Sequence, residues 1–373
     1  MLKVGVVGCG AIADAHAWAI KAVPGCELVA ACDSEPLMTK QFCERFQVTG
    51  AFTELTRMLD EARPDVVHIL TPPQSHFVVA EKCLNHGTHV YTEKPFTLIP
   101  SETEKLLALA VEKQLKITVG HDALFTPAAI EARRLVDDGY LGGAPLHMES
   151  YYGYEFGNTY GNALLSDKQH WVRKLPGKLL QNIISHGIAR VAEYISGDKP
   201  EVIALGFVSP LLQEVGEEEI TDELRVIIRD EKGVTAYFTF SSRMRPTVNQ
   251  LRVFGPENGL FMDETQQLVI RMSGRRYKSY AEKFIPAVAY SRQYLGNFFR
   301  NMRLFLGSNF HGESGKKHLT ESFYRAITEG APDPIPHEKI RLTGWIMDQI
   351  FQQIDIDKTN SRRNAEPSPV LQS

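Results

Sequence analysis

The first 33 residues constrain the fold more than any other stretch of the chain. A short β-rich apolar run, residues 3–7, leads directly into Gly8-Cys9-Gly10-Ala11-Ile12-Ala13. An amphipathic stretch follows to about Val23, and a second apolar run, residues 27–32, ends in Asp33. This order of strand, glycine turn, helix, strand and acid is the fingerprint of dinucleotide binding, with Ala at its last position. We therefore predict a cofactor-binding βαβ unit, the alternative being a plain βαβ unit with a tight turn.

Each part of this fingerprint has a physical role. Gly8 permits the tight turn, Gly10 lets the backbone approach a pyrophosphate, and Ala13 lets the helix pack closely on the strand. The helix N-terminus offers free N–H groups to the phosphates, and the Asp33 carboxylate can accept hydrogen bonds from ribose hydroxyls. A 2′-phosphate would meet this carboxylate, and no arginine is adjacent, so we expect NAD rather than NADP. The predicted cofactor-binding residues here are Gly8, Gly10, Ala11, Ile12, Ala13 and Asp33.

Length and composition exclude several classes of protein. At 373 residues the chain is long enough for two domains, and a net charge of −4 gives no indication of a nucleic-acid partner. Its five cysteines are odd in number and contain no CxxC pair, which favours reduced thiols in a cytoplasmic protein and no metal site. No window of 18 apolar residues occurs, so we predict no membrane span and no membrane partner.

The pattern of strands and helices changes at about residue 122. Residues 1–122 alternate strand and helix patterns, as in a doubly wound parallel sheet. Residues 123–356 hold six β-rich runs of a largely antiparallel sheet, with a helix predicted over 179–195 and further helices toward the C-terminus. Residues 357–373 are polar and are predicted to form a disordered tail. We expect an NAD-binding Rossmann domain followed by an α+β domain for substrate binding and oligomerisation.

Ligands of doubly wound sheets bind beyond the carboxyl ends of the strands. Besides the glycine turn, that rule selects the loop 71–76 and the triplet Glu93-Lys94-Pro95. Lys94 directly follows a buried strand, so its cation could polarise a substrate oxygen or contact the nicotinamide ribose. The simpler interpretation is a solvated lysine at a strand end. The predicted cofactor-binding residues of these loops are Thr71, Pro72, His76, Glu93 and Lys94.

Two segments of the second part are candidates for substrate chemistry. Asn182 and His186 are four residues apart and would share one helix face, with His186 as a proton acceptor near neutral pH. Residues 151–176 are rich in aromatic, amide and basic side chains, which suit a polyhydroxylated ligand. Either segment could instead be structural, as a satisfied histidine or an aromatic interface. The predicted substrate-binding residues are Lys94, Tyr152, His170, Trp171, Arg173, Asn182 and His186.

These motifs occur in the order seen in the Gfo/Idh/MocA oxidoreductases, and the chain resembles that family over about residues 2–355. The Glu93-Lys94-Pro95 element is the most specific motif. The resemblance implies a Rossmann domain plus a domain with a large open mixed, mostly antiparallel sheet, which often mediates homodimers or homotetramers. It implies NAD(P)-dependent oxidation or reduction at a secondary carbon of a sugar, sugar derivative or cyclitol. Lys94 matches the family's active-site lysine, and His186 matches the histidine of its Asp-x-x-x-His pair.

The chain departs from the family pattern at two places. Asn182 stands where the family has aspartate, and residues 121–127 lack the arginine that many members carry after the sixth strand. Amide cannot take a proton, so we assign the acid–base role to His186, with Lys94 as helper and Asn182 orienting the substrate. Our hypothesis is an NAD-dependent oxidoreductase of carbohydrate-like alcohols or ketones. The alternatives are an NAD-dependent glycosidase of the same fold, a reductase of a non-sugar carbonyl, and a non-catalytic sugar-responsive regulator.

Overall fold

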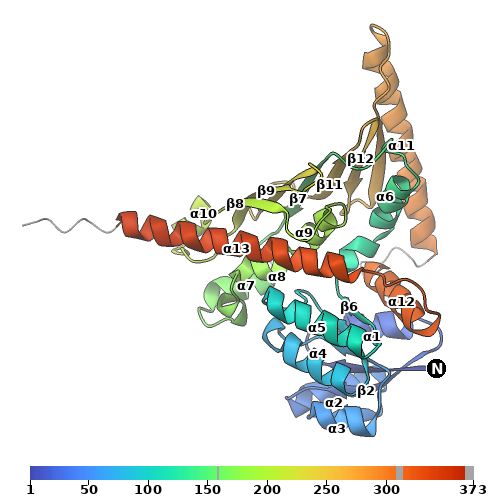
Figure 1. The fold of residues 1–373 in the computed structure, drawn as a ribbon, viewed down its shortest axis with the longest axis vertical. Coiled ribbons are helices and arrows are strands. Elements are labelled where there is room, and N and C mark those ends of the chain that lie inside the picture. The colour runs from blue at the N-terminus through green and yellow to red at the C-terminus, as the bar shows by residue number, and fades with distance from the viewer. Residues whose placement is uncertain (158, 308–313, 366–373) are drawn as a thin grey trace, which may run out of the picture.

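The computed structural model describes residues 1–157, 159–307 and 314–365 (Figure 1). A six-stranded parallel sheet forms the N-terminal part, with strand order β3-β2-β1-β4-β5-β6. The order reverses between β1 and β4, which creates the crevice in which doubly wound sheets bind ligands. The strands are β1 Leu2–Val7, β2 Cys26–Cys32, β3 Gly50–Phe52, β4 Val66–Ile69, β5 His89–Thr92 and β6 Ile117–Val119. The helices are α1 Ala13–Lys21, α2 Pro36–Phe46, α3 Leu55–Glu61, α4 His76–Asn85 and α5 Pro100–Glu112.

A seven-stranded mixed sheet forms the second part, with strand order β13-β12-β11-β7-β10-β9-β8. Within the described residues β7 and β10 are its parallel pair, and the other neighbours are antiparallel. The predicted fold class is therefore confirmed, and β12 adds a seventh strand to the six runs found in the sequence. The strands are β7 His147–Gly153, β8 Glu201–Phe207, β9 Glu223–Arg229, β10 Thr235–Ser241, β11 Asn249–Phe254, β12 Asn258–Asp263 and β13 Leu268–Ser273.

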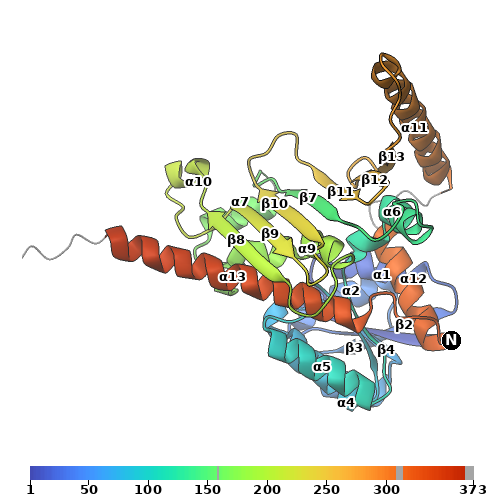
Figure 2. The same ribbon diagram turned by 45° about the horizontal axis from the view of Figure 1, so that its top comes forward.

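The helices of the second part are α6 Pro127–Asp137, α7 Thr159–Ser166, α8 Lys178–Ile183, α9 Ser185–Ala192, α10 Pro210–Glu214, α11 Ala281–Leu306, α12 Ser314–Thr328 and α13 His337–Ala365. Of these, α9 packs on the middle strands β7 and β10, whereas α13 and α11 lie at the β8 and β13 edges of the sheet (Figure 2). Short 3₁₀ helices are η1 Pro73–Ser75, η2 Asp122–Phe125 and η3 Trp171–Lys174. No helix within the described residues is long and apolar enough to cross a membrane.

The C-terminal part of the chain returns to the first sheet. Leu319, Phe323 and Tyr324 of α12 are buried in the same apolar cluster as the residues of β1 and β4. The α12 helix therefore contributes to the core of the Rossmann domain, although its Tyr324 lies 256 positions after His68 of β4. The strands of the first sheet precede residue 122 and those of the second sheet follow it. That residue 122 is also a domain boundary stays a prediction.

Two expectations about helices need correction. The helix predicted over 179–195 is divided into α8 and α9, with the break at Ile184. The α13 helix extends to Ala365, so the first nine residues of the tail predicted to be disordered are helical. Residues 366–373 of that tail lie outside the described residues.

Candidate active site

The glycine turn lies at the carboxyl end of β1, next to the end of β4. Gly8 has a φ of +94°, and a Cβ there would stand 2.8 Å from the carbonyl carbon of Leu70 and the amide nitrogen of Thr71. Any side chain would therefore push β1 away from the loop that follows β4. A Cβ at Gly10 would meet nothing within 4 Å, so this residue borders open space where a phosphate can approach the backbone.

The start of α1 has the features of a phosphate site. Ala13 is fully buried against the sheet, whereas Ala11 and Ile12 are exposed. Among the described residues no side chain caps this helix, so its first N–H groups can bind an anion. Asp33 accepts hydrogen bonds from the amide of Cys9 at 2.8 Å and from that of Glu35 at 2.9 Å. The Asp33 carboxylate thus lies beside the glycine turn, and these residues fit a dinucleotide.

His76 joins the other two predicted loops. Its buried ring lies 2.9 Å from the carbonyl oxygen of Thr71 through Nε2 and 2.8 Å from that of Pro95 through Nδ1. Burial lowers the pKa of His76, and a neutral ring donates to one of these carbonyls at a time. Pro72 precedes η1, the first turn of this loop. The structure therefore places His76 between the loops as a link, with both ring nitrogens directed at the backbone.

Lys94 lies at the boundary between the two sheets. Its ammonium group donates a hydrogen bond to the main-chain carbonyl of Asn182 at 2.8 Å. Burial lowers the pKa of Lys94, an effect that the carboxylates of Glu93 and Asp122 oppose. The predicted residues Lys94 and Asn182 are thus brought together across 88 positions of sequence, with the Asn182 main chain as the acceptor.

His186 faces a carboxylate that the sequence analysis did not assign. Its Nδ1 atom lies 3.8 Å from Oδ1 of Asp122, and it has no hydrogen-bond partner among the described residues. Burial lowers the pKa of His186 to about 4, although Asp122 opposes the effect; Lys94 lowers it further. His186 is therefore neutral at pH 7 and lies close to both an acid and a cation.

Lys316 connects this carboxylate to Glu93. The ammonium of Lys316 lies 3.0 Å from Asp122 Oδ2 and 3.2 Å from Glu93 Oε1, with its side chain 3% exposed. Burial alone would lower the pKa of Lys316, but the two carboxylates raise it well above its ordinary value. Burial would likewise raise the pKa values of Glu93 and Asp122, but Lys316 lowers both. The cluster is thus a buried lysine held between two ionised carboxylates.

A line of hydrogen bonds extends from Glu93 through the Rossmann core. Glu93 Oε1 lies 2.8 Å from His16 Nε2, and His16 Nδ1 lies 2.9 Å from His68 Nδ1. His68 Nε2 in turn lies 2.8 Å from the hydroxyl of Tyr324. Burial lowers the pKa of both histidines, and one set of neutral tautomers satisfies the three contacts from Tyr324 to Glu93, with Tyr324 as the first donor and Glu93 as the last acceptor. We call this line, together with Lys316 and Asp122, the buried polar network.

The structure therefore places Glu93 in the buried polar network, where its carboxylate contacts Lys316, His16 and the amide of Lys94. Sequence reasoning missed the partners in this network. A signal existed for Asp122, because it follows the carboxyl end of β6, where the rule for doubly wound sheets expects ligand-binding residues. No such signal existed for Lys316, whose position on α12 depends on the return of the chain to the first sheet.

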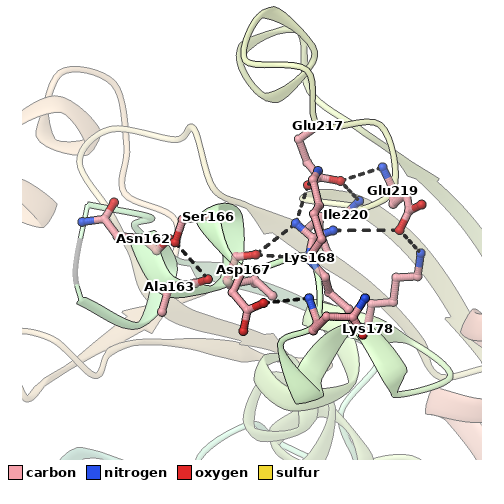
Figure 3. Close-up of polar contacts among 12 residues, drawn as sticks. Asn162, Ala163, Ser166, Asp167, Lys168, Lys178, Glu217, Glu219 and Ile220 are labelled. Atoms are coloured by element: carbon pink, nitrogen blue, oxygen red, sulfur yellow. Dashed lines mark hydrogen bonds and ion pairs between the residues drawn. The ribbon is translucent and has the colours of Figure 1, made fainter.

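Charged contacts at Glu217 anchor the predicted aromatic segment, and Figure 3 shows Lys168 beside this carboxylate. The guanidinium of Arg173 donates to Glu217 at 2.5 Å and to the carbonyl of Leu164, while Lys168 lies 3.2 Å from the same carboxylate. Arg173 thus contacts protein groups and holds the segment to the loop at residues 217–220. His170 and Trp171 stack on each other and are partly exposed.

Tyr152 lies beside Gly187, the residue that follows the candidate histidine in α9. A Cβ at Gly187 would stand 3.3 Å from the ring of Tyr152, and burial raises the pKa of this tyrosine. Among the described residues no group of three histidine, cysteine or acidic side chains could hold a metal ion.

Comparison with known proteins identifies the first sheet. Residues 2–121 match the Gfo/Idh/MocA family model, described as an oxidoreductase family with an NAD-binding Rossmann fold. Residues 2–121 of the chain therefore belong to the Gfo/Idh/MocA family of oxidoreductases. Its N-terminal sheet is thus an NAD(P)-binding Rossmann domain, and the predicted family is confirmed.

Three relatives show the range of this Gfo/Idh/MocA family. The chain is 25% identical to 1-carboxy-3-chloro-3,4-dihydroxycyclohexa-1,5-diene dehydrogenase of Comamonas testosteroni, over 73% of this chain and 70% of the relative. It is 31% identical to UDP-N-acetylglucosamine 3-dehydrogenase of Acidithiobacillus ferrooxidans, over 40% of this chain and 44% of that enzyme. Myo-inositol 2-dehydrogenase of Thermotoga maritima is 21% identical, over 85% of this chain and 93% of that enzyme.

A solved structure extends the likeness to the second sheet. The structure of the Acidithiobacillus enzyme superimposes with a TM-score of 0.71 at 20% identity, covering 95% of this chain and 98% of that one. Both parts of the chain therefore share the fold of that protein.

Proposed function

We propose that this protein is an NAD-dependent oxidoreductase acting on a secondary alcohol, or its ketone, of a sugar, sugar derivative or cyclitol. The observation that carries the proposal is the meeting of Lys94, His186 and Asp122 beyond the carboxyl edge of the Rossmann sheet. A cation, a neutral imidazole and a carboxylate are the groups that proton transfer at a carbinol oxygen requires. The names of the nucleotide-sugar and inositol relatives support the substrate class.

The nucleotide would be held by Gly8, Gly10, Ala11, Ile12 and Ala13 at its phosphates and by Asp33 at its ribose. When bound, NAD supplies the nicotinamide that exchanges hydride with the substrate. Thr71 and Pro72 border the same crevice and contribute to its wall. The position of Asp33 supports NAD over NADP, because a 2′-phosphate would lie against its carboxylate.

His186 acts as the proton acceptor in alcohol oxidation and as the donor in reduction. A carboxylate beside Nδ1 favours the tautomer with its proton on that nitrogen, which leaves Nε2 to take the hydroxyl proton. Catalytic hydrogen bonds are often long before substrate binds, and 3.8 Å between Nδ1 and Oδ1 is such a distance. Asp122 thereby supplies from η2 the carboxylate that Asn182 lacks.

Lys94 donates a hydrogen bond to the reacting oxygen and stabilises the negative charge that develops there. Its bond to the Asn182 carbonyl sets the direction of the ammonium group. Asn182 thus positions Lys94 through its main chain. Tyr152, His170 and Trp171 provide surfaces for the substrate, whereas Arg173 stabilises the segment through Glu217.

The oligomeric state and location belong to the same proposal. We propose a homodimer or homotetramer formed through the open face of the second sheet, where Ile203, Leu205, Ile227 and Tyr237 are exposed. The five cysteines are free thiols, which supports a cytoplasmic protein, and the net charge of −4 supports one without a nucleic-acid partner. Light scattering of the pure protein measures its mass and tests the assembly.

An NADH-absorbance screen tests the function. The purified protein is incubated with NAD or NADP and with sugars, sugar acids, nucleotide sugars, cyclitols and a cyclic dihydrodiol carboxylate. We expect NAD reduction with a polyhydroxylated substrate, and the same substrate should fail with His186→Ala. Turnover of the dihydrodiol alone would favour the non-sugar alternative, which the Comamonas relative supports. Release of an aglycone without net NADH would indicate a glycosidase, and NADP preference would contradict the role of Asp33.

A further inference from the structure

The α11 helix contacts its own domain through polar side chains. The Asn297 carboxamide accepts from the amide of Val269 at 3.2 Å and donates to the carbonyl of the same residue at 3.0 Å. Gln293 makes the same pair of bonds with Arg271, at 2.7 and 3.0 Å. These carboxamides complete the hydrogen bonds of the edge strand β13, as a neighbouring strand would. Arg300 and Asn301 donate to the carbonyls of Gln267 and Gln266 and continue this contact face.

The opposite side of α11 carries an apolar stripe. Its members recur at alternating steps of four and three residues, interrupted at Ser291, and their side chains are between 43% and 66% exposed. On a helix this spacing places them on one face, opposite Gln293 and Arg300. We define the α11 stripe as Phe284, Val288, Leu295, Phe298, Met302 and Phe305.

This arrangement reverses the usual orientation of a surface helix, which buries its apolar face against its own core. No residue of α11 is buried, and the helix extends away from the body of the protein (Figures 1 and 2). With roughly half of each large side chain exposed, the α11 stripe offers on the order of 600 Å² of apolar surface. A patch of this size marks an interaction surface.

Basic residues surround the α11 stripe. Residues 275–306 contain seven basic side chains and one acid, Glu282, in a chain whose net charge is −4. The carboxylate of Glu282 accepts a hydrogen bond from the amide of Tyr277. The exposed basic residues are Arg275, Arg276, Lys278, Lys283, Arg292 and Arg303. Charge complementarity therefore calls for an anionic partner.

We propose that α11 docks this protein on the surface of an anionic phospholipid bilayer, with the α11 stripe in the acyl-chain boundary and the basic residues against lipid phosphates. This proposal replaces the expectation of no membrane partner, which rested on the lack of an apolar window long enough to span a bilayer. Aromatic and aliphatic side chains on one face with arginine and lysine beside them are the composition of interfacial helices. Lysine and arginine stems reach over apolar surface to keep their charges at the headgroups. Such binding lies along the bilayer plane and needs no spanning helix, in agreement with the absence of one among the described residues.

A second copy of the chain fits the surface less well. Pairing two α11 stripes would bring two helices together that each carry Lys283, Arg292 and Arg303 against a single acid. Positions that flank a helix–helix seam ordinarily carry acids and bases that pair with each other, whereas α11 offers its basic residues a single acid, Glu282. Like charges at that distance repel, so an anionic surface is the better partner.

Vesicle sedimentation of the full-length protein tests the proposal. The probes are extruded vesicles of pure phosphatidylcholine and of phosphatidylcholine with 30% phosphatidylglycerol by mole, as an order-of-magnitude match to anionic membranes. We expect sedimentation with the anionic vesicles alone, and its loss at high salt, where surface charges are screened. Replacing Arg292 and Arg303 by Gln should weaken binding about fivefold for each residue.

A matched pair of double variants separates the α11 stripe from general surface hydrophobicity. Phe284→Glu with Phe305→Glu changes side chains that are 66% and 62% exposed, and Val111→Glu with Val78→Glu changes two of equal exposure on the Rossmann domain. We expect the first pair to lose vesicle binding and the second to keep it, with unchanged melting temperature and NAD affinity in both. Equal binding by both pairs would overturn the proposal. A second outcome would also overturn it: the wild-type protein is a dimer that does not bind vesicles, and the first pair of substitutions converts it to a monomer. A second copy of the chain would then cover the α11 stripe.

Discussion

The ammonium group of Lys94 donates its hydrogen bond to the main-chain carbonyl of Asn182, with 2.8 Å between nitrogen and oxygen. A carbonyl oxygen is present whatever side chain occupies the position. The exchange of the family's aspartate for asparagine therefore leaves this support of Lys94 intact. In the proposed mechanism, Asp122 takes the place of the missing carboxylate, because it faces His186 from another element.

Asn182→Ala is expected to lose much less activity than His186→Ala. The main-chain acceptor of Lys94 remains, so kcat should fall by less than about tenfold, well below the loss expected for removal of a general base. Steady-state kinetics on the substrate found in the screen measures this. A loss as large as that of His186→Ala would show that the side chain itself takes part in the reaction.

His186→Ala should lower kcat by about 10²- to 10⁴-fold, the usual contribution of a positioned acid–base group. NAD binding should stay within a factor of two or so, since the imidazole is assigned to substrate and not to nucleotide. Turnover and NADH fluorescence titration measure the two quantities. Unchanged turnover would remove His186 from the mechanism.

Asp122→Asn should lower kcat by about 10- to 100-fold, because the imidazole loses the carboxylate that orients its tautomer. Asp122 raises the pKa of His186, so the variant should shift the acidic limb of the pH–rate profile to lower pH. Asp60→Asn is the matched control, since Asp60 lies at the same 3.8 Å from His86 on the surface. A variant with wild-type kcat and pH profile would contradict the role of Asp122.

Lys316→Met is expected to destabilise the fold by about 3–5 kcal/mol, because Glu93 and Asp122 would keep buried charges without their cation. Urea unfolding followed by circular dichroism measures the free energy. Lys113→Met, which removes an exposed lysine near Glu112, should change it by less than about 1 kcal/mol. Adding Glu93→Gln to Lys316→Met should recover part of the loss, and no recovery would argue against charge as its cause.

Stability should fall as the pH drops from 6.5 toward 4. Burial lowers the pKa of His16 and His186 to about 4 and that of His121 to about 3, so the unfolded chain binds more protons in this window. The stabilisation from each histidine is fully present above the pKa of about 6.5 that histidine has in the unfolded chain. It amounts to about 3 kcal/mol for a histidine whose pKa is lowered to about 4. Urea unfolding at several pH values measures the slope, which His121→Asn should reduce. A flat profile between pH 7.5 and 5 would contradict these pKa shifts.

The sequence alone determined the cofactor domain and supplied the main candidates for its site residues. A glycine turn between a buried strand and a helix restricts the backbone locally, so residues 8–13 could be assigned without knowledge of distant contacts. The same holds for Lys94, since parallel strands present their carboxyl ends at one edge of the sheet. His186 was predicted as a site residue because its spacing and residue type match a family pattern.

The tertiary structure alone decided how these residues are charged and held. Lys316 reaches Glu93 because α12 returns to the Rossmann core, 223 positions along the chain, and no local pattern encodes such a contact. Asp122 becomes the partner of His186 only when two separate elements meet. The spacing of apolar residues in α11 predicts a stripe on one side of the helix. It does not predict which side of the helix faces the protein, because that depends on the surface against which the helix packs. Local preferences fix where an element begins and ends, whereas burial and ion pairing depend on which elements pack together.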